Sequence, residues 1–344
     1  MNQFEKYLEQ YNYKLPENLI AQEPIKPRDA ARLMVYSRVT KKVSLDTFTN
    51  LAKYLPHNSV LVFNQTRVIP ARLWLKKPTG GKIQIFYIGF KKGFIKVLAD
   101  RKISIGMKLS LNDNIFFTVC NQENNIYLLK ANLSINKIKD ALYKYGVTPL
   151  PPYIKHSLLT EKQKRREYQT IYAKKGLSVA APTAGLHFSK QLINRLKALG
   201  ITVLFVNLNV GLGTFATLKE DNLITKKLHS EEFDIDIKTA NALNKAKNKG
   251  CPIIAVGTTA LRALESACVG NSIRKYIGQT ELFITPGYKF KFVDGLITNF
   301  HVPKSSLLML TAALIGRKNI LSLYKLAIKN KFRFFSFGDG MLLY

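Results

Sequence analysis

The chain has 344 residues, of which 53 are Lys or Arg and 22 are Asp or Glu, and its formal net charge is +31. Because 47% of the residues are hydrophobic, the composition excludes a disordered chain and allows a large core, enough for about two or three domains. So basic a chain favours a polyanionic partner, although only 13 of the 53 cations are Arg, and a coding bias towards Lys explains the excess equally well.

The cysteines and the amino terminus indicate a soluble protein of a reducing compartment. Cys120, Cys251 and Cys268 are odd in number and widely spaced, unlike the cysteines of a disulfide framework. Residues 1–13 lack the apolar segment of a secretory signal, and the apolar stretch 307–316 is about half of the ~20 residues that a membrane span needs. We therefore expect a cytoplasmic protein with no membrane partner.

The chain begins with an α/β pattern and then changes to short strands. A strand at 32–36, a helix near 48–55 and a strand at 60–63 are expected first. Between 71 and 133, short apolar runs separated by Gly and Asn predict five or six strands of a small antiparallel barrel or sandwich. The clearest runs are 83–87, 94–98, 108–111, 115–119 and 126–129.

A helix at 135–145 and a proline-rich segment at 149–152 end this region, and the α/β pattern then returns. The expected elements are strands at 201–210, 233–237 and 253–256 and helices at 239–249, 260–267 and 320–328. The predicted fold is a discontinuous α/β main domain with a mixed sheet, residues 1–66 and 153–344, with an antiparallel β-barrel domain, 67–152, inserted into it.

The stretch 295–338 contains no Asp or Glu and several cations. Its helical periodicity over 320–328 leaves Lys318, Lys325 and Lys329 on the outer face, and Lys331 and Arg333 follow the helix. This pattern predicts a basic surface, which is either a nucleic-acid contact or an ordinary solvated face.

Two glycine-containing segments are candidate ligand sites. Gly211 and Gly213 belong to a Gly-x-Gly-x-x-Ala motif after an apolar strand, but no amphipathic helix is apparent over 217–222 to support a dinucleotide. A glycine turn beside a ligand and a purely structural turn both remain open. Thr258 and Thr259, after Gly257, begin a helix whose free N–H groups favour an anion.

Arg262, one turn into that helix, either adds a fork to the same anion site or pairs with Glu265 on the helix surface. Three histidines, His187, His229 and His301, lie at breaks between elements, where site residues concentrate. One His per segment does not suit zinc, so we expect no metal. His229 and Glu231 are a possible acid–base pair on one strand face.

The same segments resemble those of the S-adenosylmethionine:tRNA ribosyltransferase-isomerase family of queuosine biosynthesis. The resemblance covers nearly the whole chain, and so many stretches in the same order make it specific. The matching segments are 15–16, 19–21, 61–73, 80–82, 150–154, 168–172, 181–188, 256–259, 286–288, 298–301 and 335–339. Three positions depart from the family's pattern, which has His at Asn209, Glu at Gln84 and Met at Leu228.

The resemblance implies a monomer of an α/β domain and a β-barrel. It also implies that the ribosyl part of S-adenosylmethionine is transferred to 7-aminomethyl-7-deazaguanine at the wobble position of tRNA. The products are epoxyqueuosine in the tRNA, adenine and methionine. S-adenosylmethionine is consumed as a co-substrate, and no metal or redox cofactor is implied. Because an amide takes up no proton near neutral pH, Asn209 either binds rather than transfers protons or impairs the enzyme.

This chemistry requires a base for the 5′ proton beside the sulfonium, a proton donor for adenine and an anchor for the methionine carboxylate. When these requirements are assigned to the matching segments, each candidate residue receives a role. His187 or His229 is the base, with Glu231 orienting His229. Thr258, Thr259 and Arg262 are expected to bind the carboxylate, and Asp339 or Asn299 the ribose or the deazaguanine. Gly211 and Gly213 form a turn beside the ligand, and His301 either binds or is merely packed. The expected tRNA-binding residues are Lys325, Lys329, Lys331 and Arg333.

Two other classes remain open from the residues alone. A nicotinamide-dependent oxidoreductase is suggested only by the Gly-x-Gly-x-x-Ala match, and it predicts binding of NAD(H) or NADP(H). A non-catalytic RNA-binding protein is suggested by charge, and it predicts tRNA binding without consumption of S-adenosylmethionine.

Overall fold

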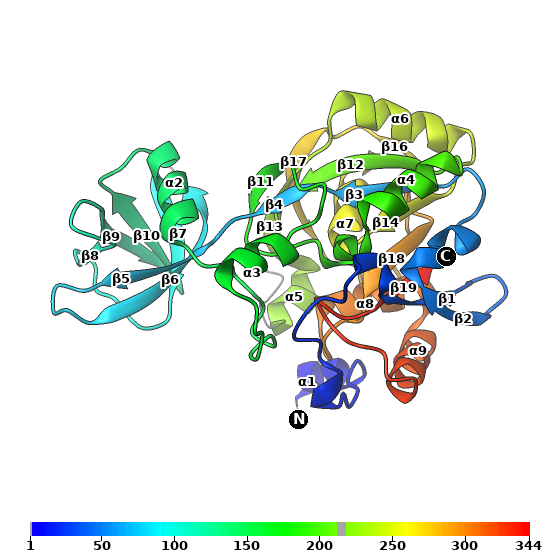
Figure 1. Cartoon of the computed structure of the whole chain (residues 1–344), viewed down its shortest axis with the longest axis horizontal. Helices are drawn as coiled ribbons and strands as arrows, with labels where there is room; N and C mark the ends of the chain where they lie inside the picture. The colour runs from blue at the N-terminus through cyan, green and yellow to red at the C-terminus, as the bar shows by residue number, and fades with distance from the viewer. Residues whose placement is uncertain (1, 92, 212–217) are drawn as a thin grey trace.

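The computed structural model describes residues 2–91, 93–211 and 218–344. It consists of an α/β body around one large sheet and a smaller barrel that projects from its side (Figure 1). The large sheet is mixed and has nine strands. In spatial order these are β17 (Ile277–Leu282), β13 (Lys227–Asp234), β12 (Thr202–Leu208), β3 (Val60–Asn64), β14 (Ile253–Val256), β18 (Gly295–Asn299), β19 (Gly340–Leu343), β1 (Arg32–Tyr36) and β2 (Val43–Thr47).

The centre of this sheet is a parallel block, because β12, β3, β14 and β18 all run the same way. Every residue of β3 is buried, which explains why Val60–Asn64 is an almost unbroken apolar run rather than an alternating one. The carboxyl ends of these strands therefore open on the same edge of the sheet, where ligands bind in open α/β folds.

The barrel is closed and entirely antiparallel. Its strands in spatial order are β10 (Ile126–Ala131), β7 (Phe94–Ala99), β6 (Lys82–Lys91), β5 (Arg72–Lys76), β8 (Lys108–Ser110) and β9 (Phe116–Glu123). Ile83, Ile85 and Tyr87 alternate into its core. The α/β class, the mixed sheet and the antiparallel barrel expected from the sequence are confirmed, and β5 is the barrel strand that the apolar runs did not single out.

Helices cover both faces of the large sheet (Figure 1). The α-helices are α1 (Gln3–Glu9), α2 (Ile135–Tyr145), α3 (Glu161–Glu167), α4 (Lys190–Ala198), α5 (Glu220–Thr225), α6 (Ile237–Asn248), α7 (Thr258–Ala267), α8 (Ser306–Ile315) and α9 (Arg317–Lys329). The 3₁₀ helices are η1 (Glu17–Leu19), η2 (Arg28–Ala30), η3 (Phe48–Tyr54) and η4 (Thr183–His187). Two short sheets pair β4 (Thr66–Val68) with β11 (Lys175–Ser178), and β15 (Cys268–Val269) with β16 (Ser272–Ile273).

Three local expectations need correction. The helix expected near 48–55 is the 3₁₀ helix η3. The strand expected at 233–237 ends at Asp234, because the Asp236 side chain accepts the Thr239 N–H and starts α6. A short helix, α5, follows the glycine motif where none was apparent in the sequence.

Among the described residues, no single helix is long and apolar enough to cross a membrane. α8 and α9 together pass on length and composition, but they are bent by 112° at the break between them.

Candidate functional site

One cavity, which we call the main cavity for its position and not for its size, lies at the carboxyl ends of the parallel strands β14 and β18. We use this name for the space bounded by segments that are far apart in the sequence but meet here. They are Tyr153, Tyr168 and the stretches 180–184, 257–259, 298–302 and 335–336. Tyr153 and Phe335 form part of an aromatic wall, with their ring centroids 4.7 Å apart. The cavity therefore offers both flat apolar surface and polar groups.

The start of α7 supplies one polar side of the main cavity. Gly257 has φ 92°, a conformation that suits glycine, and it makes the turn from β14 into the helix. Thr258 and Thr259 follow, and the Asn64 amide donates to the Thr259 hydroxyl at 3.1 Å. Both threonines lie in the wall of the main cavity, and their binding of a ligand there stays a prediction.

Asn299 supplies a second polar group, at the end of β18, the strand paired with β14. Its Nδ2 donates to the Phe335 carbonyl at 3.1 Å and lies 3.1 Å from His187 Nε2. Its Oδ1 is buried and has no hydrogen-bond partner among the described residues. The amide is thus held firmly through its nitrogen while its oxygen is available to a ligand.

His187 lies behind Asn299 rather than in the wall of the main cavity. Its ring stacks on Phe48 at 4.2 Å between centroids, and burial, with Arg333 and Arg28 nearby, lowers its pKa to about 3. Since Asn299 Nδ2 is a donor, His187 Nε2 accepts and its proton sits on Nδ1. The imidazole is therefore neutral near pH 7 with its basic nitrogen engaged, which suits positioning of Asn299 better than proton abstraction.

His301 borders the main cavity but is also tied into the fold. Its Nε2 lies 2.9 Å from the Thr298 hydroxyl, and its backbone N–H donates to the Tyr324 hydroxyl at 2.7 Å. Burial lowers its pKa to about 3. The ring is thus a packed, neutral histidine with one edge towards the cavity.

The burial of His187 and His301 predicts a pH dependence of stability. Both folded pKa values are about 3, below the unfolded value near 6.5, so the unfolded chain binds more protons between these pH values. The free energy of unfolding should fall from pH 6.5 towards 3 by up to ~1.4 kcal/mol per pH unit for each histidine. Urea denaturation of the His187→Gln/His301→Gln protein should give a flatter dependence; an unchanged slope would contradict this.

A second cavity adjoins the first, with Leu307 in the wall of both. Its polar residues include His229, Glu231 and Arg262. Glu231 does not orient His229 as predicted, because its carboxylate accepts from the Arg262 guanidinium and from the Gly211 N–H at 3.1 Å. His229 is exposed at the mouth of this cavity.

The expected grouping of Arg262 with Thr258 and Thr259 also needs correction. One helical turn carries Arg262 away from the main cavity into the second one. Its alternative partner, Glu265, is instead occupied by the Phe292 and Val293 N–H groups at 3.0 and 2.9 Å.

Asp339 and Arg333 are structural rather than free to bind. The buried Asp339 carboxylate accepts the Arg32 and Arg333 N–H groups at 3.0 and 2.8 Å, and burial raises its pKa. Arg333 donates to the Phe337 carbonyl at 2.8 Å. Both side chains are therefore engaged within the fold, and the roles of Asp339 in nucleoside binding and of Arg333 in tRNA binding stay predictions. Lys325, Lys329 and Lys331, by contrast, are exposed as expected.

Two of the three departures from the family pattern, Asn209 and Gln84, lie outside the walls of both cavities, whereas the third, Leu228, lines the second cavity beside His229. Asn209 Oδ1 accepts from the Thr66 hydroxyl and the Leu177 N–H, both at 3.3 Å, so Asn209 links β4 and β11 to the end of β12. Gln84 lies on β6 of the barrel, opposite the half-exposed Trp74. Of the two motif glycines, Gly211 meets Glu231, while Gly213 lies outside the described residues.

Sequence reasoning missed the aromatic wall of the main cavity. Tyr153, Tyr168 and Phe335 all belong to segments that carry the resemblance, but aromatic residues in apolar stretches give no signal that separates core from site. As for metals, the described residues include no group of three or more His, Cys, Asp or Glu arranged to hold one.

Comparison with known proteins identifies the family. A family model described as "Queuosine biosynthesis protein" matches residues 8–343. The chain belongs to this queuosine biosynthesis family. The S-adenosylmethionine:tRNA ribosyltransferase-isomerases of Carboxydothermus hydrogenoformans and Halothermothrix orenii are each 43% identical to it, and each alignment covers 98% of this chain and 99% of the relative. Membership confirms the resemblance and the expected class, a transferase and isomerase.

The fold is shared with a solved member of the family. The crystal structure of S-adenosylmethionine tRNA ribosyltransferase from Thermotoga maritima matches with a TM-score of 0.56 at 32% sequence identity. The match covers 97% of this chain and all of that one, so both the α/β body and the barrel belong to the common architecture.

Proposed function

We propose that this protein transfers and isomerises the ribosyl moiety of S-adenosylmethionine onto 7-aminomethyl-7-deazaguanine at the wobble position of tRNA. The products are epoxyqueuosine-tRNA, adenine and methionine, and the protein acts as a cytoplasmic monomer without a metal or redox cofactor. One observation carries the proposal: segments of the family pattern that are up to about 180 residues apart in the chain border a single cavity beside the α7 start.

In the proposed reaction a base removes a proton from the 5′ carbon, and the sulfonium stabilises the resulting ylide. Adenine leaves as the sugar ring opens, and the tRNA amine adds at the 4′ carbon. The renewed ylide then attacks the 1′ aldehyde, and the oxygen formed there closes the epoxide as methionine is expelled. We assign the base to His229, because its imidazole is exposed beside the second cavity, whereas His187 is buried with a pKa of about 3.

The main cavity suits the nucleoside part of the co-substrate. Tyr153 and Phe335 offer aromatic faces to a planar base. The Asn299 oxygen accepts from a ribose hydroxyl or a base edge, and Thr258 and Thr259 present hydroxyls and helix-start N–H groups to ribose oxygens.

One mass-spectrometric assay tests the proposed function. The protein is incubated with S-adenosylmethionine and tRNA that carries the aminomethyl base, and free adenine and the epoxide nucleoside are measured. Formation of both is expected. Binding of tRNA without either product would favour the non-catalytic alternative, and binding of NAD(H) or NADP(H) would favour the oxidoreductase.

The basic surface after β18 is the proposed tRNA-binding face. Lys325 and Lys329 project from α9 and Lys331 follows it, all exposed. Replacing the three with Gln should weaken tRNA binding and reduce the slope of log K against log salt concentration by about 1 for each phosphate that is no longer neutralised. Filter binding at several salt concentrations measures both.

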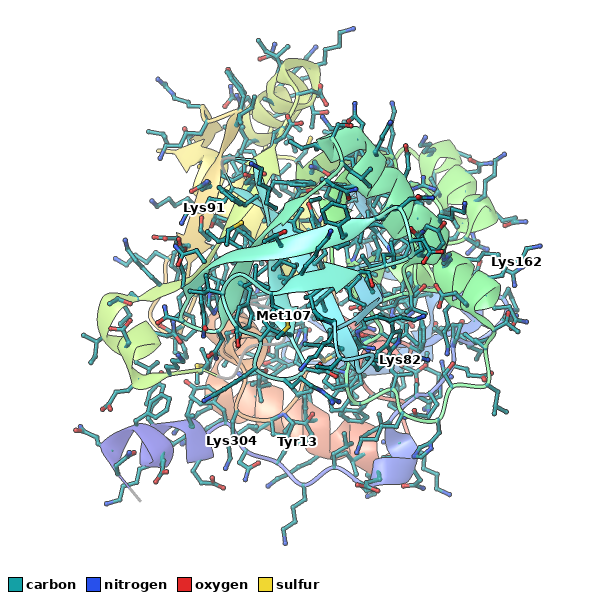
Figure 2. All side chains as sticks on the ribbon, turned by 90° about the vertical axis from the view of Figure 1, so that its left-hand side faces the viewer. Tyr13, Lys82, Lys91, Met107, Lys162 and Lys304 are labelled. Atoms are coloured by element: carbon teal, nitrogen blue, oxygen red, sulfur yellow. The ribbon has the colours of Figure 1, made fainter. Side chains whose placement is uncertain are left out.

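A matched control comes from Lys238, Lys245 and Lys249 on and beside α6, which are also exposed but lie at the opposite end of the α/β body from α9 (Figure 1). Lysines also project from the barrel and from α3, among them Lys82, Lys91 and Lys162 (Figure 2). If the α6 triple variant reduced affinity as much as the α9 variant, binding would depend on overall charge and not on the α9 surface.

A further inference from the structure

The second cavity contains the buried guanidinium of Arg262, and one of its N–H donors has no hydrogen-bond partner among the described residues. Arg262 is only 7% exposed, its Nε donates to the Leu282 carbonyl at 3.0 Å, and its Nη1 donates to Glu231. Its Nη2 is buried and has no partner among the described residues. An unsatisfied donor on a buried charged group is unfavourable, so a guanidinium held in this way indicates a site that a ligand completes.

Both signs of charge are present in this cavity. Arg262 offers a free N–H, and the Glu231 carboxylate, with four lone-pair positions, uses some of them on Arg262 and the Gly211 N–H. A simple anion such as phosphate would meet the Glu231 charge as well as the Arg262 charge. The zwitterionic end of an α-amino acid instead matches the pair, carboxylate to guanidinium and ammonium to carboxylate.

Apart from Ser306, the rest of the wall is apolar, and through Leu307 it adjoins the main cavity. Its residues are Leu228, Leu282, Phe283, Ile284, Leu307 and Leu310. Leu307 borders both cavities, and α7 also reaches both, with Thr258 and Thr259 in one and Arg262 in the other. A ligand with a nucleoside at one end and an amino acid at the other would therefore lie along α7.

We propose that the second cavity is the amino-acid subsite for S-adenosylmethionine, in which Arg262 Nη2 binds the carboxylate and Glu231 receives the ammonium group. This inference rests on the proposed function and divides the co-substrate between the two cavities. Of the three residues to which the sequence assigned the carboxylate, it keeps Arg262 and leaves Thr258 and Thr259 to the nucleoside part in the main cavity.

The test compares S-adenosylmethionine with its decarboxylated analogue, which keeps the ammonium and sulfonium groups. By calorimetry, the wild-type protein should prefer S-adenosylmethionine by about 10–100-fold, the range expected for loss of a charge-assisted hydrogen bond. In Arg262→Met the preference should disappear through weaker binding of S-adenosylmethionine, with binding of the analogue unchanged. Arg195→Met, the same substitution at an exposed position on α4, should keep the wild-type preference.

Equal wild-type binding of the two compounds, or an Arg262→Met protein that keeps the preference, would overturn the subsite. If Arg262→Met does not fold, the Glu231→Leu/Arg262→Met protein, which removes both charges, takes its place in the same comparison. A wild-type protein that binds neither compound would instead overturn the proposed function, so the two failures are distinguishable.

Discussion

Replacing Glu231 with Ala should lower the free energy of unfolding by about 3–5 kcal/mol, the range for removing one partner of a buried ion pair. Glu231 is 4% exposed, and its carboxylate neutralises the buried Arg262 and accepts the Gly211 N–H. Without it, Arg262 remains desolvated and without a counter-charge. Urea denaturation measures the loss as a lower midpoint with an unchanged slope.

Two further variants test whether the unpaired Arg262 cation causes the loss of stability. Glu232→Ala changes the neighbouring, exposed carboxylate of β13 and should alter the free energy of unfolding by less than about 0.5 kcal/mol. The Glu231→Leu/Arg262→Met protein should recover most of the stability, because it removes both buried charges together. If it were as unstable as Glu231→Ala, the loss would come from packing rather than from the unpaired cation.

The Glu231→Leu/Arg262→Met protein also separates the contribution of the ion pair to stability from its contribution to ligand binding. It should fold but bind S-adenosylmethionine weakly, since neither partner of the amino-acid subsite remains. A buried ion pair that can be removed at little cost to the fold, but not to ligand binding, is retained for the ligand.

The elements that could be predicted from the sequence are those whose apolar periodicity and flanking residues are both clear in the local sequence. The helix Ile135–Tyr145 and the strand Ile253–Val256 have the predicted bounds, because Gly146 ends the helix and Pro252 and Gly257 flank the strand. The 3₁₀ helix at 48–54 differs from the predicted helix only in its hydrogen bonds, which one or two turns of apolar spacing do not reveal. Strand β5 has only 5 residues, so its alternation, with Leu73 and Leu75 buried around Trp74, is too brief to stand out among the apolar runs.

The site could be predicted as a set of segments but not as a set of contacts. Sequence spacing suggested Glu231 with His229 and Arg262 with Glu265, which are neighbours along one strand or one helix. The structure instead pairs Glu231 with Arg262, 31 residues apart, because α7 packs beside β12 and β17 and brings its buried face to β13. Asp339 likewise accepts the backbone N–H of Arg32 at the start of β1, 307 residues away.

Replacing His229 with Gln should reduce turnover by about 10²–10⁴-fold, the usual contribution of a positioned general base. His229 is exposed at the mouth of the second cavity, so the free energy of unfolding should change by less than about 0.5 kcal/mol. His229 lines the same cavity as Arg262, to which the proposed subsite assigns the carboxylate. The measurement uses S-adenosylmethionine deuterated at the 5′ carbon and follows both product formation and loss of deuterium to water.

Loss of deuterium distinguishes a base from a binding residue. A variant in which only affinity is reduced should exchange normally at saturating co-substrate, whereas His229→Gln should stay slow at every concentration. His57→Gln, the same substitution at an exposed histidine away from both cavities, should behave as wild type. If His229→Gln exchanged deuterium at the wild-type rate, the base would have to be His187, and Asn299 would then have to move before the buried imidazole could take the proton.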